Sequence, residues 1–565
     1  MEDSNYWKRL RTNRVTRRAL LGGTATVAAG GAAALAVGCG GGTGSFVADF
    51  PILTPGATPI PGGTITQGRT INALGIDPHV DLTALDIDQL LYSYLYGWAP
   101  DAEEVVFNNL AESLEVIDDV TFNFGLNRGV KIHPNAPVGA GEEMNSEDCK
   151  QSIVRRGTSI SAPDKRFAKF IAGAIDKQLL AAAIDTPDPQ HFTFTMSEPF
   201  VPAIREMANP TWAMVPAKII DKFLSLSQDA FGSGPFMLEE FRGSERIVLK
   251  KHPEYFIPDR PYLDGINYII ITENSSLLTA FKSGQHDVNG AFLTSKDAEK
   301  LDEDERVFIA SAPSAFYNVI HFKIKPPFDD IRVRKAIDLA LDRDEFISGL
   351  QDGRGEYNGP IQWVQKQWAL PQEELREFYQ YRPEEAKALM DQAGFPDGFE
   401  VKMKIPKLAG ISFISDTALL IKDQLARIGI TINIDEVELG QYISSVILPG
   451  NFEMTYFPNL PYDEPDRPLS FYHSLGVTGN GNWTNYTNPE LDKLINAQAA
   501  EFDVDKRKEI IFEAQRLILN EHGPQITLTG FFQFQARWKY VHFPFEFFED
   551  NQGNPIGADM WRQPV

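Results

Sequence analysis

The sequence predicts a multi-lobed α/β protein, and three features of the chain support this fold class. Its 565 residues exceed what one hydrophobic core can organise and indicate about two to four domains. Short segments of alternating apolar and polar residues lie between positions 100 and 200, whereas helices followed by glycine and an apolar strand lie between 330 and 440. Because the two regions differ in periodicity, they predict different architectures in different parts of the chain.

The N-terminus has the three parts of an export signal. Six of the first eighteen residues are basic, and the uncharged, Ala- and Gly-rich segment Ala19–Gly38 follows them. Residues 16–21 read T-R-R-A-L-L and resemble a twin-arginine export motif, and Cys39 ends a string that resembles a lipobox. Residues 1–38 are therefore expected to be a twin-arginine-type lipoprotein signal, with Cys39 as the lipidated residue. An uncleaved membrane anchor is the alternative, because residues 19–38 could cross a bilayer at about 1.5 Å per residue.

Residues 39–62 are expected to be a linker. Four prolines and six glycines occur among the 23 residues from Gly40 to Gly62, with almost no charge. Such a composition cannot bury a hydrophobic core. As a flexible coil, the segment would span roughly 25–30 Å, so it can hold a folded body away from a membrane. The folded body is expected to begin at Gly63.

Two segments in the first half of the chain alternate as half-buried strands do. The first follows a turn at Asp118 and Asp119, and polar residues separate its apolar ones. The second shows the same two-residue period. The apolar residues of the two segments are Val120, Phe122, Phe124, Leu126, Phe192, Phe194 and Met196.

Four amphipathic helices are expected in the second half. Their expected cap or first residues are the pair Asp329 and Asp330, then Pro383, Ser415 and Asp503. The second of these helices is expected to end at Gly394. The third leads through Gly429 directly into a strand that begins at Ile430. A helix, a glycine and an apolar strand in this order are typical of a mixed α/β sheet.

Composition and charge exclude several classes of protein. Hydrophobic residues make up 43% and charged residues 23%, which is ordinary for a soluble globular protein. The net charge of −24 disfavours nucleic acid as a partner, because phosphates would be repelled. The only cysteines, Cys39 and Cys149, are too few for a disulfide framework or a cysteine-based zinc site.

Motifs for catalysis and metal binding are absent from the sequence. The chain contains no G-x-S-x-G, S-x-x-K, H-E-x-x-H or C-x-x-C string, and no Gly-Lys pair that a P-loop would need. Its nine histidines are scattered, and no two are four residues apart. The sequence therefore predicts a binding protein without a catalytic centre, cofactor or metal ion. An exported hydrolase is the remaining alternative, because catalytic triads assemble in space rather than in sequence.

Seven strings occur in one order along the body of the chain. They are Gly62–Ile65, Leu110–Lys131, Gly232–Phe236, Lys251–Phe256, Pro327–Ile337, Glu385–Phe395 and Gln424–Ile430. Together they resemble the family 5 extracellular solute-binding proteins, the oligopeptide- and dipeptide-binding type that serves ABC importers. The resemblance runs from about Gly62 to Phe543. Phe322 departs from it, because Asn is usual in the family at this position before the Pro-Pro-Phe string.

The resemblance implies a two-lobed periplasmic-binding-protein-like fold of type II, with a hinge and an additional subdomain on the first lobe. The implied first lobe comprises residues 63–97, 205–310 and 523–565. The additional subdomain comprises residues 98–204, and the second lobe residues 311–522.

The resemblance also implies the ligand and the partners. We expect a short peptide to be captured outside the cytoplasmic membrane and passed to ABC permease subunits with their ATPases. The protein itself is expected to be a periplasmic or cell-surface monomer attached to the membrane by its lipid. A non-peptide ligand such as a metal complex, a sugar or another small solute is the alternative, because fold alone does not fix the ligand.

An extended peptide needs a carboxylate for its ammonium group, a cation for its carboxylate and roomy aromatic pockets between them. The stretch that resembles the ammonium-binding region of the family is residues 456–466, in which Asp463 is the first candidate and Asp466 the second. A solvated acidic turn is the alternative interpretation. Arg354 and Arg467 are candidates for the cation.

Several aromatic side chains are candidates for the ligand-binding walls, with burial in a core as the alternative for each. They are Tyr317, Trp363, Trp368, Tyr456, Phe457 and Trp483, and in the first lobe Trp98 and Trp212. Phe322 is a further candidate. If it faces the ligand, it replaces a polar contact with an apolar one and indicates a less polar or shorter ligand than a standard oligopeptide.

Overall fold

The structure is a computed structural model that describes ten segments of the chain. They are residues 58–81, 83–98, 105–106, 109–159, 165–223, 225–408, 411–459, 464–478, 482–543 and 556–564. The expected export signal, Cys39 and most of the expected linker lie outside these residues, and so does Asp463. Within the described segments, no helix combines the length and hydropathy that a membrane crossing requires.

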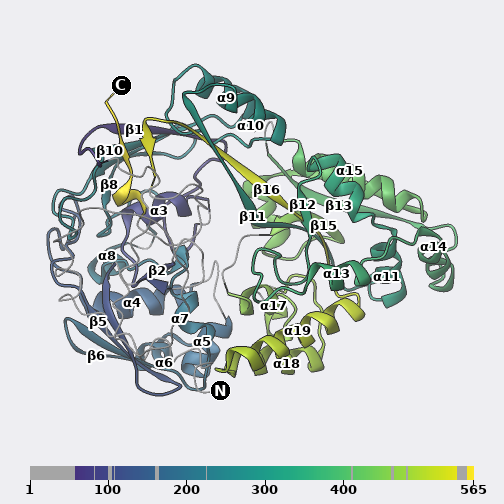
Figure 1. Ribbon diagram of the computed structural model, residues 1–565. Helices are drawn as coiled ribbons and strands as arrows, with labels where there is room; N and C mark the ends of the chain where they lie inside the picture. Colours follow the sequence, from purple (N-terminus) through teal and green to yellow (C-terminus); the bar gives the residue numbers. More distant parts are fainter. Residues whose placement is uncertain are drawn as a thin grey trace, which may run out of the picture.

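Two four-stranded sheets form the first part of the molecule, which we call the first lobe (left in Figure 1). One sheet has the order β1-β10-β9-β8, in which β1 and β10 are parallel and the other pairs antiparallel. The other has the antiparallel order β4-β5-β7-β6. The strands are β1 (Thr64–Arg69), β4 (Ala111–Val116), β5 (Thr121–Leu126), β6 (Ile184–Asp188), β7 (His191–Thr195), β8 (Phe236–Arg242), β9 (Arg246–Lys251) and β10 (Gly265–Ile270).

Helices surround these sheets, and one continuous hydrophobic core joins both sheets. Strands β5 and β7 contain the alternating segments that the sequence predicts, and Phe122, Phe124, Phe192 and Phe194 are fully buried in that core. The helices are α3 (Leu85–Leu91), α4 (Ser146–Gly157), α5 (Lys165–Ala172), α6 (Lys177–Ala182), α7 (Pro202–Glu206), α8 (Ala217–Lys222), α9 (Asn274–Lys282) and α10 (Ser295–Asp302). Short pairs add β2 (Gly97–Trp98) with β3 (Val105–Val106), and β17 (Val541–His542) with β18 (Trp561–Arg562).

A six-stranded mixed sheet of order β12-β16-β11-β15-β13-β14 forms the centre of the second lobe (right in Figure 1). Its strands are β11 (Val307–Phe322), β12 (Gly355–Tyr357), β13 (Phe399–Lys407), β14 (Ile430–Glu438), β15 (Met454–Asn459) and β16 (Gln525–Trp538). The helices are α11 (Ile331–Ala340), α12 (Arg343–Leu350), α13 (Gln372–Phe378), α14 (Pro383–Gln392), α15 (Phe413–Ala426), α16 (Leu439–Tyr442), α17 (Asp466–Ser470), α18 (Pro489–Ala500) and α19 (Val504–Asn520).

Three of the four predicted helix starts are confirmed. The Asp330 carboxylate accepts a hydrogen bond from the Arg332 amide at the start of α11, and Pro383 is the first residue of α14. Asp503 caps α19 by accepting hydrogen bonds from two backbone amides of its first turn. Each cap satisfies amide groups that a helix start leaves without an intrahelical partner.

The prediction that Ser415 caps a helix is wrong. Helix α15 begins at Phe413, so Ser415 lies in its first turn and its hydroxyl donates to the Glu436 carboxylate on β14. The ring of Phe413 packs against Phe531, with 5.0 Å between ring centres. This tertiary contact favours an earlier helix start than the serine alone indicates.

Strands β11 and β16 connect the two lobes. They are the long antiparallel pair that crosses the upper part of Figure 1, from α9 and α10 to the sheet of the second lobe. Their pairing is interrupted between Pro313, opposite Phe532, and Tyr317, opposite Gly530. A β-bulge of this kind bends a strand and increases its twist locally. The hydrogen-bonded pairing of β11 and β16 is therefore irregular at this point of the connection between the lobes.

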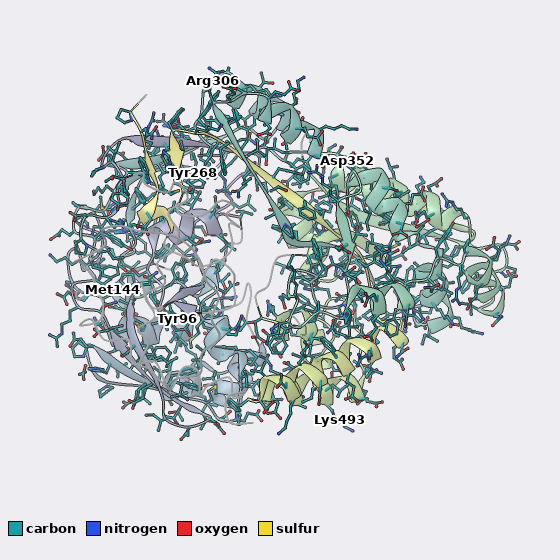
Figure 2. All side chains as sticks on the ribbon, in the orientation of Figure 1. Tyr96, Met144, Tyr268, Arg306, Asp352 and Lys493 are labelled. Atoms are coloured by element: carbon teal, nitrogen blue, oxygen red, sulfur yellow. The ribbon has the colours of Figure 1, made fainter. Side chains whose placement is uncertain are left out.

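Side chains fill each lobe around its own sheets. In Figure 2, Tyr96 and Met144 lie within the first lobe, and Lys493 points outward from α18 of the second lobe. Tyr96 and Met144 are buried, whereas Lys493 is exposed.

Candidate functional site

Four aromatic side chains form a cluster on one face of the second-lobe sheet, and we call it the aromatic wall. It consists of His321 on β11, Phe457 on β15, Phe471 after α17 and Trp483 before α18. The rings of His321 and Phe457 stack with 4.7 Å between their centres, and Trp483 lies 6.2 Å from Phe457 and 5.4 Å from Phe471. In Figure 1, α17 lies at the edge of the second lobe that faces the first lobe.

The alternation of β15 decides which of its residues belong to this wall. Tyr456 points into the core of the second lobe, where it is fully buried and donates a hydrogen bond to Asn318 at 2.8 Å. Phe457 points to the opposite face and is half-buried, as is Trp483. Successive side chains of a strand point to opposite faces, so two adjacent candidates have different environments.

His321 is the most deeply buried side chain of the aromatic wall. Its side chain is fully buried, and this burial lowers the pKa of the imidazole to about 3. The ring is therefore neutral at physiological pH. It offers the half-exposed rings of Phe457 and Trp483 an uncharged surface to pack on, so the wall presents apolar area rather than charge.

Trp363 is half-buried and packs on the connecting strand β16. A Cβ atom at Gly530 would lie 2.1 Å from the Nε1 atom of Trp363, so only glycine leaves room for the indole. The indole also meets Phe532 edge-on, with 5.8 Å between ring centres. Both contacts fall where the pairing of β11 and β16 is interrupted. Trp363 is thus positioned beside the connection between the lobes.

A buried polar network lies next to α17. The Arg507 guanidinium donates to the Glu464 carboxylate and to both the backbone and the side-chain oxygen of Gln498. The Gln498 amide donates in turn to Asp466, and the Arg507 guanidinium lies 5.2 Å from the ring centre of Trp368. All five side chains are almost completely buried. Within the second lobe, Arg507 and Gln498 contact the two acids of this network, Glu464 and Asp466.

The structure separates the sequence-predicted residues into two groups. Phe457, Trp483 and Trp363 are half-buried and positioned as described above. The others that the structure describes are nearly or fully buried: Tyr317, Phe322, Trp368, Tyr456, Asp466 and Trp212. Strand β2 ends at Trp98, and the side chain of that residue lies outside the described part, as does all of Asp463.

Each buried candidate has neighbours within its own lobe. Phe322 stacks on Phe328 at 4.8 Å between ring centres and belongs to the core of the second lobe, so it does not face the first lobe. The Tyr317 hydroxyl accepts a hydrogen bond from the Asn459 side chain at 3.1 Å. Trp212 packs on Phe167, at 4.2 Å between ring centres, in the core of the first lobe.

The two candidate cations lie in exposed or mixed environments. Arg354 is about half-exposed and forms an ion pair with Glu299 at 3.5 Å. The Arg467 guanidinium lies 5.6 Å from the ring centre of Phe471, which belongs to the aromatic wall. Arg467 is therefore the candidate cation that the structure brings closest to the aromatic wall.

Sequence reasoning missed three buried residues of this region, the charged Glu464 and Arg507 and the neutral Gln498. A signal for one of them, Arg507, was present. Arg507 shares the buried face of α19 with Ile511, Ala514 and Ile518, at helical spacing. A charged residue at a position where the pattern demands an apolar one predicts a buried partner of opposite charge.

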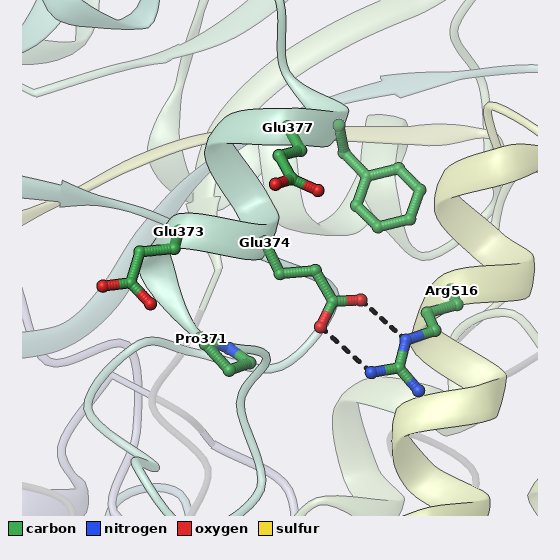
Figure 3. Close-up of a pocket in the computed structure, with 6 residues that line it drawn as sticks. Pro371, Glu373, Glu374, Glu377 and Arg516 are labelled. Carbon is green, nitrogen blue, oxygen red and sulfur yellow. Dashed lines mark hydrogen bonds and ion pairs between the residues drawn. The ribbon is translucent and has the colours of Figure 1, made fainter.

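The pocket shown in Figure 3 has a volume of about 640 Å³ and lies between α13 and α19. It is lined by Pro371, Glu373, Glu374, Glu377, Phe378 and Arg516. Two hydrogen bonds of 2.6 and 3.0 Å join the Arg516 guanidinium to Glu374, and this contact lowers the pKa of the Glu374 carboxyl. The pocket contains no residue of the aromatic wall. Since Glu374 and Arg516 satisfy each other, we do not assign the ligand to this pocket.

Among the residues that the structure describes, no three His, Cys, Asp or Glu side chains are arranged to hold a metal ion. Cys149 is buried in the first lobe, and burial raises the pKa of its thiol well above the usual range. A thiol in this state is not a reactive nucleophile.

The sequence matches a family model and resembles several characterised bacterial proteins. A family model described as bacterial extracellular solute-binding proteins, family 5 Middle, matches residues 105–483. A dipeptide-binding protein of Pseudomonas aeruginosa is 25% identical over 498 residues, which cover 83% of this chain and 90% of that protein. The glutathione-binding protein GsiB of Salmonella choleraesuis is 26% identical over 504 residues, which cover 86% and 91%.

A solved structure resembles the whole described fold. The dipeptide-binding protein of Pseudoalteromonas sp. SM9913, in complex with Met-Leu, gives a TM-score of 0.77 at 19% sequence identity. The match covers 89% of this chain and 100% of that one. The likeness confirms the two-lobed α/β fold that the sequence predicts.

Proposed function

The chain belongs to the bacterial extracellular solute-binding proteins of family 5, and from this membership we propose that it captures short peptides for an ABC importer. It would bind its ligand outside the cytoplasmic membrane and deliver it to the permease subunits, which their ATPases power. Relatives named for dipeptide and glutathione binding align with at least 83% of the chain and support this ligand class. The role requires no covalent chemistry, and we propose that the protein is not an enzyme.

We propose that ligand capture uses closure of the two lobes about β11 and β16. The interruption of their pairing at Pro313–Tyr317 and Gly530–Phe532 supports a hinge at this point, because a broken ladder bends more easily than a continuous one. For the extents of the lobes we keep the expectation from the sequence, residues 63–97, 205–310 and 523–565 for the first lobe, 98–204 for its subdomain and 311–522 for the second, with β16 crossing from the sheet of the second lobe into the first.

The aromatic wall is the single observation that carries our assignment of the ligand-binding region. Phe457 and Trp483 keep part of their rings exposed at the edge of the second lobe, whereas most neighbouring aromatic side chains are buried. Half-exposed rings that pack on the neutral imidazole of His321 suit the varied side chains of peptides, because they add apolar contact without requiring one shape of side chain. The wall would therefore bind peptide side chains rather than the charged termini.

The termini of the peptide need charged partners, and we keep the sequence-based candidates for them. Asp463 is the first candidate for the ammonium group and Asp466 the second. Because Asp466 already accepts a hydrogen bond from Gln498, a ligand would have to share or replace that contact. Arg467, beside the aromatic wall, is the preferred candidate for the ligand carboxylate.

We further propose that the protein is exported by the twin-arginine route and attached to the membrane through Cys39. The basic, uncharged and cysteine-ending parts of residues 1–39 support this, and the Gly- and Pro-rich linker would give the lobes freedom to reach the permease. Confinement near the permease raises the effective concentration of the binding protein there. No second copy of the chain is needed for this role, and we expect a monomer.

The experiment that tests the peptide assignment is mass spectrometry of ligand retained by the purified full-length protein. Native spectra would give the bound mass, and denaturing spectra would release it for fragmentation. We expect a set of masses that fragment as short peptides. One non-peptide mass would overturn the peptide assignment while leaving the solute-binding role intact, and cleavage products from added peptides would contradict the non-enzymatic role.

A further inference from the structure

The two lobes meet at a second place, opposite the connecting strands. Helix α7 of the first lobe lies beside the α17–α18 region of the second lobe in the lower part of Figure 1. The Val201 amide, directly before α7, donates a hydrogen bond of 2.7 Å to the carbonyl oxygen of Ala499 in α18. Ala499 and Phe502 are buried in the core cluster of the first lobe, although they belong to the second.

An ion pair reinforces this contact. The Nε atom of Arg205 in α7 lies 3.4 Å from Oε2 of Glu464, and both side chains are at least nine-tenths buried. The other carboxylate oxygen of Glu464 accepts from Arg507 within the second lobe. Glu464 is therefore held between two arginines, one from each lobe.

Two arginines and two acids face one another in this network. Arg205 and Arg507 carry two positive charges, and Glu464 and Asp466 carry two negative ones. Separation of the lobes would take Arg205 away from Glu464, which would keep its contact with Arg507. Buried ion pairs lose much of their attraction to desolvation, so the network contributes a modest bias and a fixed alignment rather than a large free energy.

We infer that Arg205 and Glu464 are positioning residues that stabilise the joined arrangement of the lobes and thereby slow ligand release. This inference rests on the proposed function, because release of a ligand enclosed between two lobes requires their separation. Breaking a contact that exists only in the joined state raises the ratio of separated to joined molecules. The rate of ligand release then rises by the same factor.

Arg205→Gln is the variant that isolates this contact. It leaves Glu464 paired with Arg507, so the second lobe keeps a neutralised buried acid and should fold. Glu464→Gln is less suitable, because it would deprive Arg507 of its buried partner. Lys493→Gln is the matched control, since it removes one positive charge from the exposed side of α18 (Figure 2). Arg205→Lys keeps the charge and should restore part of the effect.

The first measurement is hydrogen exchange of the ligand-free, full-length protein. The peptide that contains the Val201 amide reports directly on lobe separation, because its hydrogen bond crosses between the lobes. We expect its exchange in Arg205→Gln to be roughly 5- to 50-fold faster than in the unchanged protein. Exchange of β5 in the first-lobe core should stay the same in both. Unchanged exchange at Val201 would overturn the inference.

The second measurement is release of a radiolabelled dipeptide mixture after a chase with unlabelled peptide. Release from Arg205→Gln should accelerate by about the factor seen in exchange, and release from Lys493→Gln should not change. Faster exchange with an unchanged release rate would overturn the link between this contact and ligand retention. If neither the unchanged protein nor any variant binds the mixture, the proposed peptide ligand is contradicted. The exchange result still decides whether the contact holds the lobes together.

Discussion

At the scale of single residues, the environment of a side chain rather than its type determines what it can do. Tyr456 and Phe457 are neighbours in one strand, yet Tyr456 is fully buried beside Asn318 and Phe457 is half-exposed over His321. The two-residue period of a strand separates them. Residue type alone made both of them equal candidates, and only the pairing of β15 with β11 decides between them.

This difference predicts opposite outcomes for two substitutions. Phe457→Ala should weaken peptide binding about tenfold, because it removes most of a half-exposed aromatic surface worth roughly 1–2 kcal/mol to a ligand. Tyr456→Phe should leave binding unchanged and lower the free energy of unfolding by about 1 kcal/mol, since it removes the hydroxyl that donates to Asn318. Isothermal titration with peptide and urea unfolding measure the two effects. Equal losses of binding in both variants would contradict the assignment of the wall.

Buried histidines predict how stability depends on pH. Burial lowers the pKa values of His133 and His321 to about 3 in the folded protein, against about 6.5 when they are exposed. Between these values the unfolded chain binds more protons than the folded one, so stability falls as the pH falls below about 6.5. Each such histidine contributes about 1.4 kcal/mol per pH unit well below 6.5.

The variant His321→Phe tests this directly. It keeps an aromatic ring against Phe457 and removes one titrating group. We expect its free energy of unfolding, measured in urea at several pH values between 6.5 and 4.5, to fall less steeply with acid than that of the unchanged protein. An identical slope for the two proteins would show that His321 is protonated in the folded state.

At the scale of helices and strands, the sequence predicts what local chemistry controls. The starts of α11, α14 and α19 follow from Asp330, Pro383 and Asp503, because capping and proline geometry act within one turn. The start of α15 could not be predicted from Ser415, because Phe413 contacts Phe531 more than a hundred residues away. Local rules fail where a distant partner stabilises one more turn.

The pair Asp503 and Ser415 makes this contrast measurable. Asp503→Ala should lower the free energy of unfolding by about 1 kcal/mol, because two amides of α19 lose their acceptor. Ser415→Ala should change it by less than about 0.5 kcal/mol, since its hydroxyl contacts an exposed carboxylate instead of capping the helix. Urea unfolding of the two variants side by side is the measurement. A larger loss for Ser415→Ala would contradict the observed start of α15.

The limits of local rules also explain how much of the candidate site can be predicted from the sequence. The sequence names Phe457, Trp483 and Trp363 as candidates by residue type, but it names buried aromatic residues such as Tyr456 in the same way. It cannot bring Arg205 to Glu464, which are far apart in sequence and belong to different lobes. Arg507 was the available signal, since an arginine on the apolar face of α19 requires a buried partner.

At the scale of the whole molecule, two of the contacts between the lobes differ in kind. The strands β11 and β16 run continuously from one lobe to the other, and we propose that they bend, whereas the contact of Arg205 with Glu464 would form on closure and break on opening. A hinge alone leaves the lobes free to separate, and a second contact alone cannot guide them together. Their positions at opposite ends of the region between the lobes give closure a direction and an end point.

The proposed lipid tether completes this arrangement and gives the last prediction. Cys39→Ala should release the protein into the soluble extracytoplasmic fraction, because the residue proposed to carry the lipid is lost while the lobes begin only after the linker. Peptide affinity of the purified variant should equal that of the unchanged protein, since the tether takes no part in the binding region. Uptake of radiolabelled dipeptides by cells should nevertheless fall, because dilution lowers the concentration of the binding protein at the permease. A variant that stays with the membrane fraction would instead support an uncleaved anchor at residues 19–38, and a variant with weakened binding would show that the linker reaches the lobes.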